Sequence, residues 1–576
     1  MGELVFTGVV IVVLCMYIFA TFDDVIFDLI YLFRYKKFKN SGLSIEEIEK
    51  DKPKRIAVMI PAWKEAGVVA PMIRSTLSLA NYSPLHIDFF VGVYPNDLET
   101  LEEVRDLSLE YVNVHCVVNG KPGPTNKSQN LNFVYSYIEK FERENRFEFE
   151  AVAVHDAEDM VHPYTFKLYS ALLNKHDMVQ LPVFALFPKG GFFSRLIAST
   201  YADEFAEHHL HHVPVREHLG MFVPSAGTGF CMRREVMRSL ALTGGVFNEK
   251  SLTEDYEMAL RLWQMGYKVH FHIQPTQRMD DKGQVRSEIV AVREHFPNEL
   301  RMSIRQKARW TYGIALQTPK LIDKSRLTEN DRMTLLRDQK GKLTNLIHLI
   351  GYPVALYSLA GLFLGWQSVQ NPLVLALLFL VLAITLFRLG MRFHSVQTIY
   401  GTREAMLATL LLPGLPLRWL VANYINTMAT LRAWRIHYLP NWGQAKPGAK
   451  TKAPQPVGVP RWDKTERSGY VAKEVLRESR RKLGDHLLFH GDITPQELAK
   501  AMEKQNFGVN RPKLGEILLS EKLISEQKLR KRLAELRWTR MSRLTMELMP
   551  RPKRKMIFQT QEQMMLERNP NITILD

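Results

Sequence analysis

The chain has 576 residues, which is too long for one compact core, so several domains are expected. Its 76 Lys and Arg residues outnumber its 60 Asp and Glu residues, and the net charge of +16 suits an anionic membrane surface, nucleic acid or phosphorylated ligands. The three cysteines are scattered, which excludes a disulfide framework and a thiolate metal site.

Residues 4–21 form an apolar segment that is long enough to cross a bilayer, which takes about 20 residues. No basic region precedes this segment and no small-residue cleavage site follows it, so residues 1–39 are interpreted as a retained membrane anchor. Four basic residues come after it, and the positive-inside rule then puts the N-terminus outside and the following domain in the cytoplasm.

Residues 40–335 are predicted to form an α/β domain, because short apolar strands alternate with helical segments. The predicted strands cover 55–60, 86–94, 112–118 and 151–154, and a parallel sheet is expected. Asp97, Lys127 and Asp156 each lie where one of these strands has ended, and ligands of such sheets bind at this edge. One anionic nucleotide could contact all three, although each residue alone would be an ordinary surface charge.

The domain is organised around the acidic stretch 155–159, His-Asp-Ala-Glu-Asp, which directly follows the fourth strand. Asp156, Glu158 and Asp159 repel one another, and a divalent cation shared with a diphosphate would remove that repulsion. Mg²⁺ and Mn²⁺ prefer such oxygen ligands, so a metal site is predicted. The alternative is an acidic turn without a ligand.

Two further stretches are candidates for ligand contact. His208, His211 and His212 share one helix face, which indicates either a metal site or a polar interface. The small-residue turn at 225–229 contains Gly227 and Thr228 and is predicted to let the backbone approach a ligand closely.

Two motifs later in the domain carry candidate chemistry. Glu254 and Asp255 precede an amphipathic helix, where a carboxylate is either an N-cap or a general base that deprotonates a hydroxyl. The segment 305–310 combines Arg309 with Trp310, a pair that binds pyrophosphate or stacks on a sugar ring, or else belongs to an interfacial helix.

Residues 336–443 are predicted to hold two spans, at 343–364 and 373–387, with a cytoplasmic basic signature after the second. The apolar stretch 405–436 is interrupted by prolines and arginines, so it is predicted to lie in the membrane interface and not to form a fourth span.

The C-terminal part begins with a Lys/Pro/Gly-rich linker at 444–470. In the module at 471–545, the sequence KLGDHLL at 482–488 recurs 31 residues later as KLGEILL at 513–519. This repeat predicts one small helical unit made twice, with each copy packing its leucines against its twin. The basic tail at 546–576 has no assigned role.

Together these motifs make residues 50–315 resemble membrane-integrated family 2 glycosyltransferases, whose nucleotide-sugar-binding domain has the GT-A fold. The resemblance implies an α/β GT-A domain embedded in an α-helical membrane protein, with a small, mostly helical C-terminal domain. It places Asp156-Ala157-Glu158 at the DxD metal position, where Glu158 replaces the usual Asp and Asp159 is a further candidate ligand. The nucleotide sugar is then expected to contact Pro61, Ala62, Glu65, Asp97, Lys127, Asp156, Gln306, Arg309 and Trp310.

By the same resemblance, Asp255 of Thr-Glu-Asp is the catalytic base beside Glu254, and the acceptor is expected near Gly227, Thr228 and Trp310. The implied reaction is a processive, inverting, Mg²⁺- or Mn²⁺-dependent transfer of hexosyl or N-acetylhexosaminyl groups. The expected donor is a nucleotide diphosphate sugar, above all a UDP-sugar, and the product is an exported exopolysaccharide. The alternatives are single-sugar transfer to polyprenyl phosphate and a non-catalytic membrane receptor or scaffold.

The repeat resembles the cyclic di-GMP-binding module first recognised at the N-terminus of type II secretion and pilus ATPases. That pattern begins with RLG, whereas both copies here read KLG, and the second copy also departs at Lys522 and Leu536. The implied ligand contacts are Arg481, Lys482, Leu483, Gly484, Leu487, Leu488, Gly491, Lys513, Leu514 and Gly515. The order of domains is similar to that of multi-pass inner-membrane proteins of bacteria that act as bacteriophage adsorption receptors. That similarity implies cytoplasmic catalytic and C-terminal domains and a periplasmic or outer-membrane export partner, with no nucleic acid.

Overall fold

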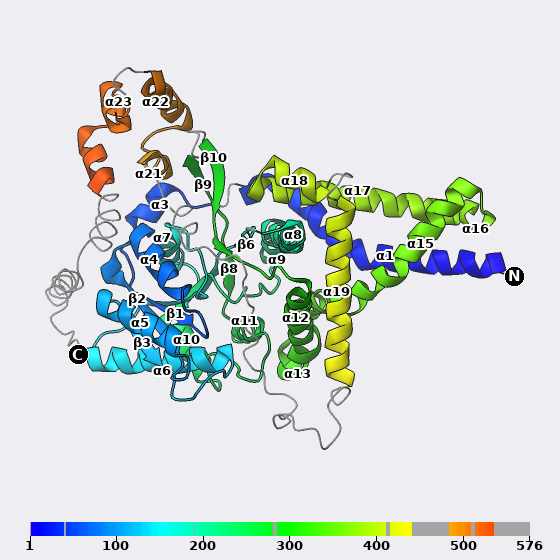
Figure 1. Cartoon of the computed structure of the whole chain (residues 1–576), viewed down its shortest axis with the longest axis horizontal. Coiled ribbons are helices and arrows are strands. Elements are labelled where there is room, and N and C mark those ends of the chain that lie inside the picture. The colour runs from blue at the N-terminus through cyan, green and yellow to red at the C-terminus, as the bar shows by residue number, and fades with distance from the viewer. Residues whose placement is uncertain are drawn as a thin grey trace.

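The structure is a computed structural model that describes residues 2–39, 42–188, 190–279, 285–409, 415–439, 483–507 and 513–534. Figure 1 shows that α1 (Gly2–Phe33), α15 (Gly341–Leu364) and α17 (Pro372–Tyr400) project together to one side of the molecule. The α/β domain and the C-terminal helices lie on the other side (Figure 1). The linker at 444–470 and the tail at 546–576 lie outside the described residues.

A seven-stranded sheet with the order β3-β2-β1-β4-β7-β5-β8 forms the centre of the α/β domain. Its strands are β1 (Ile56–Pro61), β2 (Ile87–Val93), β3 (Val114–Val118), β4 (Ala151–Val154), β5 (Met178–Gln180), β7 (Phe230–Arg233) and β8 (Val269–Phe271). The first four strands pair in parallel, but β7 runs antiparallel to both β4 and β5.

The four predicted strands therefore pair in parallel as expected, but the sheet as a whole is mixed. The reason lies in the turn at 225–229, which reaches the sheet beside the carboxyl end of β4. There the Gly229 N–H donates to the Val154 carbonyl at 3.0 Å, so the strand that follows must run back along β4.

Both faces of the sheet are covered by helices, which explains why its strands read as continuous apolar runs. Ile56, Val58 and Ile60 point to one face, and Ala57 and Met59 point to the other. The first face packs on α4 (Val69–Leu79), α5 (Leu98–Glu110) and α7 (Thr165–Leu172). The second packs on α6 (Lys127–Asn145), α10 (Arg234–Ala241) and α11 (Glu254–Gln264). Each large apolar side chain buried in this way contributes about 1.5–3 kcal/mol.

Three helices in the described part of the chain are long and apolar enough to cross a membrane: Leu4–Phe33, Glu329–Leu364 and Pro372–Tyr400. They contain the three predicted spans and extend beyond each of them. The stretch at 405–436 falls on two shorter helices, α18 (Thr402–Thr409) and α19 (Leu415–Tyr438), and adds no fourth candidate among the described residues. The direction in which each span crosses remains a prediction.

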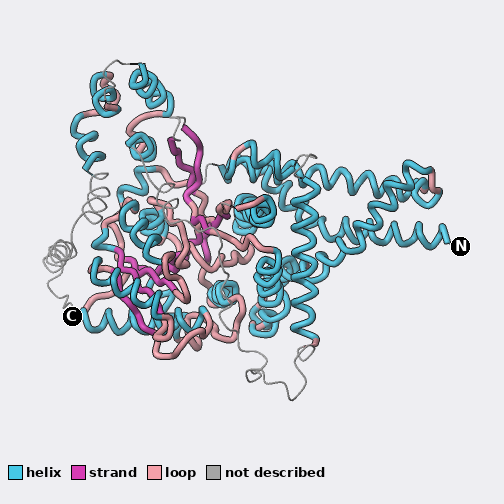
Figure 2. The backbone as a smooth tube through the Cα atoms, in the orientation of Figure 1, coloured by secondary structure: helices cyan, strands magenta, loops and turns pink. Residues whose placement is uncertain are grey.

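The remaining elements join the sheet to the spans. One run consists of α8 (Phe192–Glu207), a π-helical turn (His208–His212) and α9 (Val213–His218), and another of α12 (Leu300–Trp310), a second π-helical segment (Thr311–Gln317) and α14 (Glu329–Gln339). Strands β6 (Val183–Ala185) and β11 (Val292–Glu294) pair in parallel, and β9 (Gln274–Met279) and β10 (Val285–Val290) form a hairpin. This hairpin extends from the domain towards the C-terminal helices (Figure 2).

The C-terminal helices are α21 (Leu483–Phe489), α22 (Pro495–Phe507), α23 (Leu514–Ser520) and residues 526–534. Leu487 and Leu498 of the first copy share one hydrophobic core with Ile517, Leu518 and Leu529 of the second. The predicted packing of each repeat against its twin is therefore confirmed.

Candidate active site

The acidic stretch forms a tight loop after β4, held by the carboxylate of Asp159. This carboxylate accepts from the Asp156 N–H at 3.1 Å, lies 2.9 Å from His155 Nδ1 and also accepts from the Thr228 hydroxyl. The Thr228 hydroxyl oxygen in turn accepts from the Asp156 N–H at 3.1 Å. Asp159 and Thr228 are both buried, so they hold the loop from the interior of the domain.

The carboxylates that gather at the loop are those of Asp156, Glu158 and Glu294, each with an oxygen within 4.8 Å of the others. Sequence reasoning expected Asp159 in this group and missed Glu294, the last residue of β11. Asp159 is instead buried, and its Oδ2 makes hydrogen bonds inside the loop. Glu294 belongs to no recognisable motif. The apolar residues before it indicate a strand, but they do not indicate which part of the domain that strand reaches.

The cluster fits a hard divalent cation, because three carboxylate oxygens are the donor set that Mg²⁺ and Mn²⁺ prefer. Its electrostatics point the same way. Burial, together with the charges of Asp159 and Asp156, raises the pKa of Glu294 well above its ordinary value, and Lys127 opposes this increase. A further positive charge at this place would relieve the repulsion.

Lys127 lies at the first turn of α6, next to the cluster. Its Nζ is 2.6 Å from Asp156 Oδ1 and donates to the Gly227 carbonyl at 3.0 Å. Burial disfavours the charged form of this side chain, but the neighbouring carboxylates of Asp156, Glu254 and Asp255 raise its pKa above the ordinary value. Lys127 is therefore a fixed point charge between the cluster and the start of α11.

Asp255 lies in the first turn of α11, where the sequence left open an N-cap or a base. The N-cap residue is Thr253, so Asp255 does not cap the helix. Burial and the charge of Glu254 raise the pKa of Asp255 to about 7, while Lys127 opposes the shift. Gly227 makes room for this side chain: its φ is +81°, and a Cβ there would lie 2.8 Å from Asp255 Oδ2. A carboxyl group that titrates near neutral pH is suited to act as a general base.

Helix α12 brings Gln306, Arg309 and Trp310 to the same place. Trp310 makes edge contacts with the rings of Tyr201 and Phe296, which hold the indole in one orientation. Gln306 Oε1 and Arg309 Nε are buried without a hydrogen-bond partner among the described residues. Such orphaned polar atoms indicate a place for a polar ligand.

One cavity of about 970 Å³ unites most of the predicted site. Its lining includes Pro61, Glu65, Lys127, Asp156, Glu158, Gly227, Glu254, Asp255, Gln306, Arg309 and Trp310. Ala62, Asp97, Thr228 and Asp159 do not line it. Asp97 Oδ2 accepts from the Lys64 N–H at 2.5 Å, so it shapes the turn after β1.

The other end of this cavity lies between the candidate spans. Tyr17 of α1, Tyr352 of α15 and Thr385 of α17 all line it, together with Asn423 of α19. The predicted site and the space between the candidate spans are therefore continuous.

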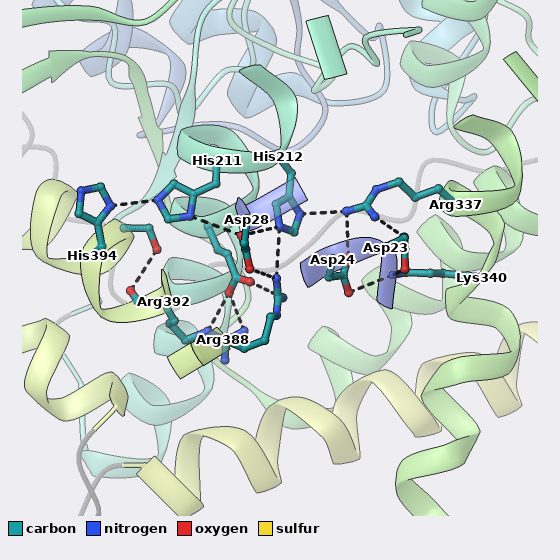
Figure 3. A network of polar contacts seen from close by, with 12 residues as sticks. Asp23, Asp24, Asp28, His211, His212, Arg337, Lys340, Arg388, Arg392 and His394 are labelled. Carbon is teal, nitrogen blue, oxygen red and sulfur yellow. Dashed lines mark hydrogen bonds and ion pairs between the residues drawn. The ribbon is translucent and has the colours of Figure 1, made fainter. Parts of the chain in front are cut away.

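An ion-pair network borders this membrane end (Figure 3). Asp28, Glu207 and His212 lie close enough together to hold a metal ion, as the histidine-rich sequence allowed. Arg388 already takes that place, because its Nη1 lies 2.6 Å from Asp28 Oδ2 and its Nη2 contacts Glu207. The polar-interface interpretation of the histidines is the one that this geometry supports.

The residues expected to contact cyclic di-GMP divide into three groups. Arg481 and Lys482 lie outside the described residues. Gly484, Leu487 and Leu488 are buried in the module core, and Gly515 packs near Leu529. Leu483 and Leu514 are partly buried, while Lys513 and Gly491 are exposed.

The sequence of the α/β domain matches the family described as Glycosyltransferase like family 2 over residues 53–313. Bacteriophage adsorption protein B of Escherichia coli (strain K12) is 33% identical over 542 residues, covering 89% of this chain and 68% of that protein. Bacteriophage N4 adsorption protein B of Escherichia coli O157:H7 matches with the same values. The chain belongs to the family of these adsorption proteins and contains a glycosyltransferase family 2 domain with an α/β, GT-A-like fold.

Two solved structures are also similar to this chain. The mannosyltransferase PcManGT from Pyrobaculum calidifontis, in complex with GDP-Man and Mn²⁺, is 15% identical with a TM-score of 0.41, over 69% of this chain and 99% of its own. S. aureus TarS 1–349, in complex with UDP-GlcNAc, is 12% identical with a TM-score of 0.28, over 72% of this chain and 100% of its own.

Proposed function

We propose that this protein is a processive, inverting glycosyltransferase that lengthens and exports an exopolysaccharide. The transferred group is a hexosyl or N-acetylhexosaminyl residue, and the donor is a nucleotide diphosphate sugar, in the first place a UDP-sugar. The observation that carries the proposal is the single cavity that joins Asp255, Lys127, the three-carboxylate cluster and Trp310.

In this reaction Asp255 removes the proton from the acceptor hydroxyl as the hydroxyl oxygen attacks the sugar. Its pKa of about 7 suits proton removal near neutral pH. Lys127 is placed to offset charge on the departing diphosphate, and Arg309 can donate to the phosphate oxygens. Trp310 offers an aromatic face to the acceptor sugar, and Gln306 offers an amide.

Asp156, Glu158 and Glu294 would hold a Mg²⁺ or Mn²⁺ ion. When bound, such an ion supplies positive charge that stabilises the leaving diphosphate. Pro61 and Glu65 also line the cavity, and their proposed role is contact with the nucleoside.

The continuity of the cavity with the space between α1, α15 and α17 supports a route for the product through the spans. We place the chain in the bacterial inner membrane, with the catalytic and C-terminal domains on the cytoplasmic side. The growing glycan then leaves through the spans towards a periplasmic or outer-membrane partner.

A polyprenyl phosphate is a second candidate acceptor, because the membrane end of the cavity has apolar walls. Val13 and Leu14 of α1 and Val354 of α15 contribute to these walls. A lipid acceptor would leave the labelled sugar in an organic extract, whereas a polysaccharide would leave it in a long water-soluble product.

Regulation by cyclic di-GMP belongs to the same proposal. The two repeats share one core, Gly491 forms a turn with φ of +63°, and Lys513 is exposed at the start of α23. Addition of cyclic di-GMP to the full-length protein should raise its melting temperature and its rate of nucleotide release. If neither the melting temperature nor the release rate changes at a high cyclic di-GMP concentration, the module does not bind this ligand.

The central test is a screen of UDP-, GDP- and other donor sugars for nucleotide release by the purified protein in lipid nanodiscs. We expect one donor class to support release and the Asp255→Asn variant to lose it. Glu99→Gln is the matched control, since Glu99 is a first-turn acid of α5, is exposed and lies outside the cavity. Equal release by wild type and Asp255→Asn with every donor would contradict the proposal.

A further inference from the structure

The first repeat of the C-terminal module is seated on the α/β domain. His486 Nδ1 of α21 lies 3.4 Å from the Tyr164 hydroxyl, and His490 Nε2 lies 3.3 Å from Asn81 Nδ2. The ring of His490 also meets the ring of Tyr164 edge-on. Tyr164, His486 and His490 are each at most 7% exposed, so solvent is largely excluded from this contact.

The surface under α21 is the far end of the loop that carries the metal cluster. This loop runs from β4 to α7 over residues 155–164, and Asp156 and Glu158 lie at its start. Tyr164 lies at its end, where the Asn81 N–H donates to the Pro163 carbonyl at 2.7 Å. The loop is held at its start by the Asp159 hydrogen bonds and at its end by the Pro163 carbonyl, so the position of one end constrains the other.

The third carboxylate of the cluster is connected to α21 by a second segment. The hairpin strand β9 lies beside α21, and its partner β10 is separated from β11 by one residue, Ala291. Glu294 ends β11. Figure 1 shows α21 next to the tip of this hairpin, on the side of the molecule away from the spans.

The two segments are also linked to each other between the cluster and α21. Met160 and Arg293 exchange backbone hydrogen bonds of 2.8 and 3.2 Å, so the loop and β11 are joined at this point. Nearer to α21, His162 Nε2 of the loop lies 3.9 Å from Glu288 Oε2 of β10. Asp156 and Glu158 therefore belong to a loop that α21 contacts, and Glu294 ends a strand that is joined through β10 to β9, the strand beside α21.

We propose that docking of the first repeat on Tyr164, Asn81 and β9 positions Asp156, Glu158 and Glu294 for a divalent cation. The C-terminal module then controls cation and donor binding at the sheet end of the cavity, and not acceptor access at the membrane end. Tyr164, His486 and His490 are positioning residues for the cluster. The inference rests on the metal assignment within the proposed function.

The test compares Tyr164→Phe and His486→Phe in the full-length protein, because each removes one side of the same contact and keeps an aromatic ring. We expect each variant to raise the half-saturating Mn²⁺ concentration, measured by electron paramagnetic resonance of free Mn²⁺, about threefold to tenfold. The double variant should be no worse than either single one, because both remove the same interaction. Backbone amides at 155–164 should exchange hydrogen faster in all three variants.

Glu521→Gln is the matched control, since it breaks an exposed ion pair with Lys504 between α22 and the turn after α23. This variant should bind Mn²⁺ like the wild type. Wild-type Mn²⁺ binding and wild-type exchange at 155–164 in Tyr164→Phe and His486→Phe would overturn the inference.

Measurements of Mn²⁺ binding and of sugar transfer test the coupling and the proposed function separately. Mn²⁺ binding that weakens in the docking variants, in a protein that transfers no sugar, overturns the proposed function and supports the coupling. A wild-type protein that binds no Mn²⁺ overturns the metal assignment and this inference with it.

Discussion

At its membrane end the cavity is bordered by four carboxylates that face four cations, whereas at its sheet end one ammonium group neighbours four carboxylates. The first set comprises Asp23, Asp24, Asp28 and Glu207 with Arg337, Lys340, Arg388 and Arg392. The second set comprises Lys127 with Asp156, Glu254, Asp255 and Glu294. Each end also has three side chains spaced for a metal ion: Asp28, Glu207 and His212 at the membrane end, and Asp156, Glu158 and Glu294 at the sheet end.

The spacing of the side chains alone therefore does not define a metal site. At the membrane end the guanidinium of Arg388 lies among the candidate ligands, so the charge is neutralised by the protein itself. At the sheet end the named carboxylates outnumber the ammonium group, and a bound cation would offset the repulsion among them. The same geometry therefore gives a structural clamp in one place and a candidate reaction centre in the other.

The largest effect is expected at the sheet end, from Asp255→Asn. Loss of a general base should lower the transfer rate by about 10²–10⁴-fold, while donor binding stays near the wild-type value because Asp255 is not placed on the nucleotide. Single-turnover transfer and equilibrium nucleotide binding measure the two quantities separately. A rate within twofold of wild type would remove Asp255 from the mechanism.

Arg388→Met should instead destabilise the ion-pair network at the membrane end. It leaves the buried carboxylates of Asp28 and Glu207 without this guanidinium, which should lower the free energy of unfolding by about 3–5 kcal/mol. Denaturant titration in micelles measures the change. Arg326→Met, which removes a surface pair with Asp323, is the control and should cost less than about 1 kcal/mol. A loss equally small for Arg388→Met would show that the network is not a clamp.

Glu294→Gln tests the sheet end directly, because it removes one carboxylate from the set that holds a single ammonium group. The half-saturating Mn²⁺ concentration should rise about tenfold, as expected when one charged ligand is lost at a cost of roughly 1.4 kcal/mol. The exposed Glu299→Gln is the control, since it lies near the start of α12 and outside the cavity. Unchanged Mn²⁺ affinity in Glu294→Gln would return the third ligand position to the residues of the acidic loop.

The pH dependence of the transfer rate is expected to be of similar size. Asp255 has a pKa raised from 3.8 to about 7, and it must be deprotonated to act as a base. The transfer rate should therefore rise about tenfold between pH 6 and pH 8 and then level off. The folded state holds more protons than the unfolded state between the two pKa values, so stability falls as pH rises through this window. Asp255→Asn should abolish both dependences, and a flat rate profile in the wild type would contradict the assignment.

The candidate site was largely predictable because most of its residues follow local signals. Lys127 and Asp156 lie just past strands that alternate with helices, and Asp255 and Trp310 lie on helices with clear amphipathic patterns. Strand ends and helix starts are set by neighbours in sequence, so their position at one sheet edge follows from the fold class. Glu294 gave no such signal, because its approach to the cluster depends on the pairing of β11 with β6.

The sequence by itself determined the elements, the three apolar helices, the repeated helical unit and the line of charged residues along one sheet edge. Tertiary structure decided which charges meet. It buried the Asp159 carboxylate in the loop and brought Glu294 into the cluster. It also put Arg388 between Asp28 and Glu207. Finally, it brought His486 into contact with Tyr164. The physical reason is range: hydrophobic periodicity and turn chemistry act over a few residues, whereas ion pairs and docking contacts form between segments that only the packed core brings together.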